Sequence, residues 1–279
     1  MNNWSARKVL WGCMAGLLLC ALLSVYRGQD TNWDLLNYHR YIAYALLNDR
    51  LHVDLAPAGL QSYFNPSLDV PVYWLSEHLP GWWVGAISGA WHGLVFMLTL
   101  LIAREVWPQA HPGRPWLVVG AGVLAPVFWA GLGNQMGDNA AAVFALGAVW
   151  TAIQCLKRLN ANVNAGWAWC ALTGTLLGLC AALKLTNVTV AVALGLAMLT
   201  GLPVRPALYL RVVACMLPCG VLGFALGGGW WFWQIWQTFG NPFFPQFGGL
   251  FPVPWPTTCR SWTSASWSRA WAAWFCGPC

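Results

Sequence analysis

Apolar residues gather in seven runs along the chain, and each run approaches the length of a membrane crossing. A transmembrane helix needs roughly 17–25 predominantly apolar residues. The runs are 9–26, 82–103, 115–133, 139–156, 166–183, 185–202 and 212–236. The pattern predicts an all-α fold, a polytopic membrane helix bundle of about seven spans. Since no small-residue cleavage site follows the first run, we expect it to stay as a helix and not to be removed as a signal peptide.

The stretch 166–202 is too long for one span, and it is interrupted only by Lys184-Leu-Thr-Asn187. We interpret it as a tight helical hairpin with this tetrad at the outer membrane surface. The alternative is a single tilted helix, which would invert the topology of everything that follows.

The polar residues concentrate between the first two runs, in the stretch 27–81. It holds three of the five His and six of the eight acidic residues, namely Asp30, Asp34, Asp49, Asp54, Asp69 and Glu77. Within it, apolar side chains recur at helical spacing over residues 33–48, which predicts an amphipathic helix lying on the membrane surface. We therefore expect one large outer loop that is partly helical.

Composition and charge narrow the class of protein. The chain is 58% hydrophobic and only 8% charged, far from the roughly one quarter of charged residues in a soluble domain. Its net charge of +6 is not clustered into a patch, which argues against a nucleic-acid binder. The short loops on one side of the predicted spans carry the basic residues, so the N-terminus is expected in the cytoplasm.

The first group of candidate catalytic residues lies just after the first apolar run. Asp34 and Tyr38 are four residues apart and share a helix face, and a carboxylate beside apolar groups becomes a better proton acceptor. Asp30 precedes the same helix. The structural alternative is that Asp30 caps this helix and that Asp34 is solvated.

Asp138 and Lys184 form the second group of candidate functional residues. Asp138 begins the fourth run on the same membrane face as Asp34, so the two carboxylates are expected to converge, unless Asp138 is only a helix cap. Lys184 either holds a phosphate oxygen or snorkels to mark the hairpin turn. Within the second run, His92 is expected to be a hydrogen-bonded packing residue near Ser88.

At these residues the sequence resembles the GT-C superfamily of integral-membrane glycosyltransferases. The similar segments are Asp34-Leu-Leu-Asn-Tyr38, Ile42-Ala43 and Leu46-Leu-Asn-Asp49 after the first helix, Asp138 in the second outer loop, and Asn241-Pro-Phe-Phe-Pro245. The resemblance covers about residues 1–255, although members of the family commonly have nine or more spans.

The resemblance implies transfer of a sugar from a polyprenyl-phosphate donor to a hydroxyl of an extracytoplasmic glycan, lipid or protein acceptor, at a bacterial inner (plasma) membrane. Asp34 is then the expected base, with Asp30 as a second catalytic acid. Lys184, Arg27 and Arg40 are candidates to stabilise the phosphate, and Tyr38 and His39 to bind substrate. Asp138 or Asp30 is expected to position the acceptor or to bind a divalent metal ion.

The segment 256–279 breaks the membrane pattern, being rich in Trp, Ser, Arg and Cys. We interpret it as the product of a shifted reading frame, which would make the protein a shortened transferase, either active or an inactive fragment; a Trp-rich interfacial anchor is the alternative. Two other functions remain open for the whole chain: a membrane transporter, which would place ionisable residues inside its spans, and a non-catalytic membrane scaffold.

Overall fold

The computed structural model describes residues 6–51, 53–54, 56–107 and 113–251 of the chain. The predicted tail at 256–279 lies outside them. The chain divides into two compact units, Met1–Trp231 and Phe232–Cys279, and each is treated by itself. The described residues form helices and no strand, which confirms the predicted all-α class.

The helices follow the predicted order. They are α1 (Ala6–Arg27), η1 (Leu35–His39), α2 (Arg40–Leu47), η2 (Gly59–Tyr63), α3 (Asp69–His78), α4 (Gly81–Val106), α5 (Arg114–Leu124), α6 (Pro126–Gly131), α7 (Asp138–Ala161), α8 (Trp167–Leu183), η3 (Leu185–Asn187), α9 (Val188–Thr200), α10 (Pro206–Phe224), η4 (Ala225–Gly229) and α11 (Trp230–Phe239). η1 and η4 are π-helical, whereas η2 and η3 are 3₁₀ turns.

Within the described residues, four helical segments are long and apolar enough to cross a membrane. They are Val9–Arg27, Gly81–Val106, Asp138–Ala161 and Pro206–Phe239. The shorter apolar helices are Arg114–Leu124, Trp167–Leu183 and Leu185–Thr200. All seven predicted runs therefore coincide with helices, but by length only four of them are full crossings.

The run 115–133 is not the continuous span that the sequence predicted. Ala125 has φ −66° and ψ 135°, and it separates α5 from α6. Because the ring of Pro126 clashes with the backbone of the residue before it, Ala125 is driven out of the helical region. The result is an 11-residue helix followed by a 6-residue helix.

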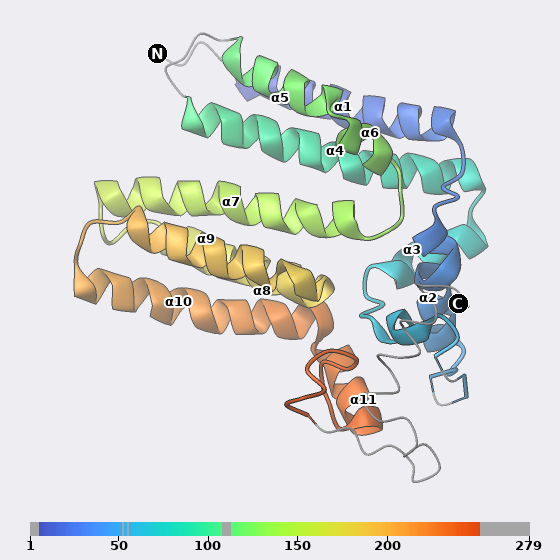
Figure 1. Ribbon diagram of the computed structural model, residues 1–279. Coiled ribbons are helices and arrows are strands. Elements are labelled where there is room, and N and C mark those ends of the chain that lie inside the picture. The colour runs from blue at the N-terminus through green and yellow to red at the C-terminus, as the bar shows by residue number, and fades with distance from the viewer. Residues whose placement is uncertain (1–5, 52, 55, 108–112, 252–279) are drawn as a thin grey trace, which may run out of the picture. The chain divides into compact units, whose positions relative to one another are not determined.

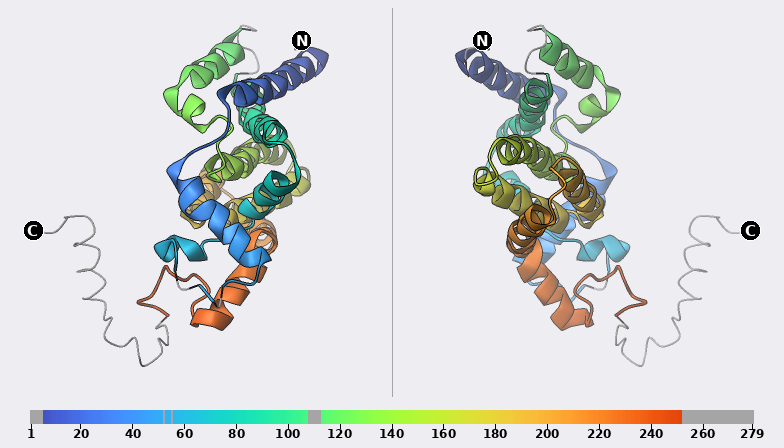
Figure 2. Two further views of the ribbon diagram at one scale, coloured as in Figure 1. Left: turned by 90° about the vertical axis from the view of Figure 1, so that its right-hand side faces the viewer. Right: turned by 90° about the vertical axis from the view of Figure 1, so that its left-hand side faces the viewer.

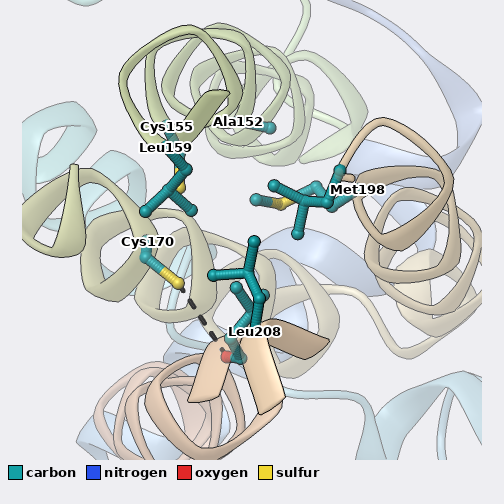
Figure 3. Close-up of a cluster of buried hydrophobic side chains, with 8 residues drawn as sticks. Ala152, Cys155, Leu159, Cys170, Met198 and Leu208 are labelled. Carbon is teal, nitrogen blue, oxygen red and sulfur yellow. Dashed lines mark hydrogen bonds between the residues drawn. The ribbon is translucent and has the colours of Figure 1, made fainter. Parts of the chain in front are cut away.

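The predicted hairpin at 166–202 is present. α8 ends at Leu183 and α9 begins at Val188, with η3 between them. Met198, near the end of α9, packs in one buried cluster with Cys170, near the start of α8, so the two helices run antiparallel (Figure 3). The cluster also takes Ala152, Cys155 and Leu159 from α7 and Leu208 from α10. Its cysteines pack as small apolar residues.

Glycines set the closest helix contacts. A Cβ at Gly178 of α8 would meet the carbonyl oxygen of Gly220 in α10, and one at Gly223 would meet that of Thr175. α1 and α4 approach in the same way, where a Cβ on Gly93 would lie 2.8 Å from the Cα of Leu17. Without a hydrophobic driving force between helices in lipid, this close backbone approach is how membrane helices gain contact.

The helices of Met1–Trp231 alternate in direction, so several ends gather at one side. The end of α1, the starts of α4 and α7 and the end of α8 lie together, and α2 and α3 cover them at the right of Figure 1. Figure 2 gives two further views of the same helices. The predicted amphipathic helix is present over residues 33–47, with Ile42, Ala43 and Ala45 buried.

We expect Gly178→Ala to destabilise the bundle by about 1–3 kcal/mol, since the added methyl group collides with backbone that cannot move aside. Gly195→Ala in α9 is the matched control, because nothing lies within 4 Å of a Cβ placed there. The control should be neutral or slightly stabilising. Unfolding of the two variants in detergent, followed by circular dichroism, compares them; equal stabilities would contradict the tight α8–α10 contact.

Candidate functional site

Six polar residues meet at the end of the bundle that α2 and α3 cover. We call Asp34, Tyr38, His39, Asp69, Asp138 and Lys184 the polar cluster. Burial, together with the negative charges of Asp34, Asp138 and Asp69, raises the pKa of Tyr38 to about 12. Asp34 directly precedes η1, whereas Asp69 and Asp138 begin α3 and α7, so the segments that carry Asp34 and Asp138 converge around Tyr38.

His39 and Asp69 form the buried part of the cluster. His39 Nδ1 lies 2.8 Å from Asp69 Oδ1, and the two residues are 9% and 7% exposed. Burial raises the pKa of the Asp69 carboxyl, although His39 and the charge of Lys184 act in the opposite direction. His39 Nε2 is also buried, and within the described residues no hydrogen-bond partner reaches it.

Asp138 and Lys184 form an ion pair at the rim of the cluster. Asp138 is the first residue of α7, but its side chain makes no capping hydrogen bond; the cap position belongs to Gly137, at φ 77°. A side chain at Gly137 would be strained at this φ and would face His39 and Leu68. Lys184 is thus already paired, and binding a phosphate oxygen would require it to share or exchange Asp138.

Asp30 has a structural role that the sequence did not indicate. Its Oδ1 accepts a hydrogen bond from the amide of Asn32 at 3.0 Å, and its Oδ2 accepts one from the amide of Gln135 at 2.8 Å. It therefore ties the segment after α1 to the segment before α7. The sequence offered Asp30 as a cap for the helix at 33–48. The cap is instead Asn32, whose Oδ1 accepts a hydrogen bond from the amide of Asp34 at 2.8 Å.

Asp34 is left with a carboxylate that accepts no hydrogen bond from any residue the structure describes. Its side chain is half-buried. Apart from the exposed Asp49, the other acidic side chains in the described part of the loop have hydrogen-bond partners. Asp34 is consequently the carboxylate of the polar cluster that is free to interact with a ligand.

The two predicted arginines are already engaged. Arg27 donates from Nη1 to the carbonyl oxygens of Trp129 and Leu132, the latter at 3.3 Å. Arg40 pairs with Glu77 at 3.0 Å, in an exposed position where an ion pair contributes little stability. Arg40 can exchange this partner at small cost, whereas Arg27 supports the end of α6.

A cavity of about 170 Å³ adjoins the cluster. Its lining includes Asp30, His39, Arg40, Asp69, Tyr73 and Gln135. His39 and Asp69 thus belong both to the polar cluster and to the cavity wall. Asp34, Tyr38, Asp138 and Lys184 do not line this cavity.

The arrangement of potential metal-binding side chains does not support the expected metal site. Within the described residues no group of three or more His, Cys, Asp or Glu side chains is arranged to hold a metal ion. Asp30 is occupied by two backbone amides and Asp138 by Lys184. These residues do not fit a divalent cation.

Two residues that the sequence did not single out help to build the site. Asp69 orients His39, and Asn65 donates from Nδ2 to the carbonyl oxygens of Ala182 at 2.8 Å and Gly227 at 3.0 Å. The Asn65-Pro66 pair signals a turn, but no local pattern identifies its partners more than a hundred residues away. Elsewhere, His92 packs edge-on against Phe128, and within the described chain neither ring nitrogen has the expected hydrogen bond.

Searches with protein-family models, with curated proteins and with solved structures found no significant match to this chain.

The charges around Tyr38 predict an alkaline step. The pKa of Tyr38 in the folded protein is about 12, against about 10 when unfolded. Its contribution to stability is therefore complete below pH 10 and is lost as pH rises toward 12. Tyr38→Phe should reduce the phenolate absorbance that develops near pH 12. Tyr26→Phe, at an 88% exposed position, is the control; an unchanged step in Tyr38→Phe would contradict the burial of this phenol.

Proposed function

We propose that the protein is a membrane glycosyltransferase that moves a sugar from a polyprenyl-phosphate donor to an acceptor hydroxyl on the outer face of the membrane. The observation that carries the proposal is the polar cluster and its adjoining cavity at one end of a bundle of apolar helices. A lipid-linked sugar has the matching shape, with an apolar chain in the bilayer and a polar head at its surface. The resemblance at Asp34, Tyr38 and Asp138 supports the same reaction.

Asp34 is the proposed proton acceptor. The acceptor hydroxyl attacks the anomeric carbon of the sugar, its proton passes to the Asp34 carboxylate, and the bond between that carbon and the phosphate oxygen breaks. The lipid phosphate leaves with the bonding electrons. The half-buried position of Asp34 and the absence of a hydrogen-bond donor to its carboxylate among the described residues favour this role.

Lys184 is the proposed phosphate ligand. A lysine that pairs with Asp138 is held at the rim of the cluster, and a doubly charged phosphate competes well for its ammonium group. Arg40 can assist after leaving Glu77. Departure of the phosphate then develops negative charge next to fixed cationic groups, which stabilises the transition state.

An apolar groove supports the donor's lipid part. A groove of about 450 Å³ lies between α8, α9 and α10, and its lining includes Leu177, Ala181, Leu196, Met216 and Phe224. Ala181 is less than one helical turn before Lys184. A prenyl chain in this groove would therefore bring its phosphate toward the lysine.

The base is tested by Asp34→Asn, which keeps the shape and removes the proton acceptor. The full chain in vesicles is supplied with undecaprenyl-phosphate-linked mannose, glucose or arabinose and a soluble glycoside acceptor, and transfer of radiolabelled sugar is measured. Transfer should fall about 10²–10⁴-fold in Asp34→Asn. Asp49→Asn is the control, because Asp49 is exposed at φ 52°, where asparagine is well tolerated. Full activity of Asp34→Asn would remove Asp34 as the base.

The orientation is tested by reporter fusions. A fusion after residue 60 should report the extracytoplasmic side, and one after residue 162 the cytoplasm. A cytoplasmic signal at residue 60 would place the polar cluster away from the proposed substrates and would refute the proposed function.

A further inference from the structure

The side chain of Asn65, in the loop between α1 and α4, uses its full hydrogen-bonding capacity. Its Nδ2 donates to the carbonyl oxygen of Ala182 at 2.8 Å and to that of Gly227 at 3.0 Å. Its Oδ1 accepts from the amide and the hydroxyl of Ser67, at 3.0 Å and 2.7 Å. A side-chain amide has two donor hydrogens and an oxygen with two lone pairs, so its orientation here is determined. The loop is thereby bonded to the end of α8 and to η4.

Asn65 supplies a donor at the point where α8 ends. In a continuous helix the carbonyl oxygen of Ala182 would accept from the amide of Thr186, four residues later. α8 instead ends at Leu183, and Lys184 is extended, with φ −143° and ψ 106°. Since Ala182 is 0% exposed, its carbonyl oxygen needs a donor from another segment once the helix stops. The amide of Asn65 therefore allows the chain to leave the helix at Lys184.

The backbone of Lys184 determines where its ammonium group lies. Its φ of −143° is about 80° from the helical value. Rotation about this bond changes the direction in which the side chain leaves the backbone. In the extended conformation, Lys184 Nζ pairs with Asp138 at the start of α7. A donor that ends α8 at Leu183 thus also acts on the position of this ion pair.

The two carbonyl oxygens that Asn65 binds border the apolar groove between α8, α9 and α10. Ala181 directly precedes Ala182, Phe224 comes three residues before Gly227, and both line the groove. A Cβ on Gly227 would lie 3.0 Å from the Cβ of Ala182, so α8 and η4 touch where Asn65 bonds to them. An apolar chain in the groove would therefore have its end near this contact.

Asn65 is also connected to the segment that carries Asp34. The amide of Asp69 donates to the carbonyl oxygen of Pro66 at 2.9 Å, so the first turn of α3 follows directly on Asn65. Asp69 Oδ1 lies 2.8 Å from Nδ1 of His39, which is the last residue of η1. Asp34 directly precedes η1. These contacts form one continuous connection between the Asp34 segment and the end of α8.

We propose that Asn65 is a positioning residue that fixes the separation between the proton acceptor Asp34 and the phosphate ligand Lys184. In transfer from a lipid phosphate, the sugar lies between the attacking hydroxyl and the leaving phosphate, and a misplacement of about 1 Å slows such a reaction strongly. The roles of Asp34 and Lys184 rest on the proposed function. The effect of Asn65 on Lys184 rests on the hydrogen bonds alone.

The first test follows the carbon next to the ammonium group of Lys184 by ¹³C NMR. The full chain has three lysines, so labelling at lysine Cε in lipid nanodiscs gives few signals, and Lys184→Arg identifies the one of interest. This signal should move in Asn65→Ala, because the end of α8 loses its donor. Asn160→Ala is the matched control. Asn160 Nδ2 also donates to a carbonyl oxygen at a helix end, that of Gly201 at 3.1 Å, and its loss should leave the Lys184 signal in place.

The second test separates positioning from a general loss of structure. Farnesyl phosphate and farnesol are compared at equal mole fractions in the nanodisc, and binding is measured from the Lys184 signal and by competition between the two. The unsubstituted protein should prefer farnesyl phosphate. Asn65→Ala should reduce this preference about tenfold and leave the affinity for farnesol unchanged. A general structural defect would weaken the binding of both compounds.

The outcomes are distinct. The proposal is overturned if Asn65→Ala leaves the Lys184 signal and the preference for phosphate unchanged, or if Asn160→Ala has an equal effect. If Asn65→Ala does not fold, Ser67→Ala removes only the hydroxyl bond to Asn65 Oδ1, and an unmoved Lys184 signal in that variant overturns the proposal as well.

A measurement of sugar transfer distinguishes this proposal from the proposed function. If the phosphate preference depends on Asn65 but no lipid-linked sugar is transferred by the unsubstituted chain, the placement of Lys184 by Asn65 stands and the proposed function fails. If transfer occurs and proceeds at the full rate in Asn65→Ala, the positioning role alone fails.

Discussion

Helix ends inside an apolar bundle leave carbonyl oxygens without donors, and side chains from distant segments supply them here. Arg27 donates to the end of α6, Asn139 to Gly131, and Asn65 to both Ala182 and Gly227. A buried carbonyl oxygen left without a donor costs about 1–3 kcal/mol, so these bonds stabilise the helix ends. The bonds of Asn65, together with the bond from the amide of Gln135 to Asp30, fix the loop between α1 and α4 onto the bundle end, where the polar cluster lies.

The same requirement explains which polar groups are free. Asp30, Asp54 and Glu77 have partners that hold the loop together, and Arg27 supports α6. Once these structural pairs are made, the groups left without a hydrogen-bond partner among the described residues of the site include the carboxylate of Asp34 and Nε2 of His39. The residue type alone does not tell whether an acidic side chain supports the structure or is free to react. The hydrogen-bond partner of that side chain does.

The sequence predicted the helices well because apolar run length and the position of Lys184 are local signals. It missed the break at Ala125 although Pro126 is visible, since the surrounding run is apolar enough to suggest continuity. It offered Asp30 as a possible helix cap and did not consider Asn32, a choice between neighbours that depends on where the first helical turn closes. The sequence does not predict the His39–Asp69 pair. Thirty residues and a turn separate the two partners along the chain, and only the packing of α3 on α2 brings them together.

The distribution of ionisable groups along the helices bears on the kind of chemistry. At one end Asp138 begins α7 and Lys184 follows α8; at the other, Lys157 pairs with Glu105 at 2.6 Å. Between them His92 is buried against Phe128, and no described titratable group is within hydrogen-bonding distance of it. A transport pathway needs a succession of polar groups at membrane depth, and a single isolated imidazole does not provide one. The described chain instead concentrates its polar groups at one end of its apolar helices.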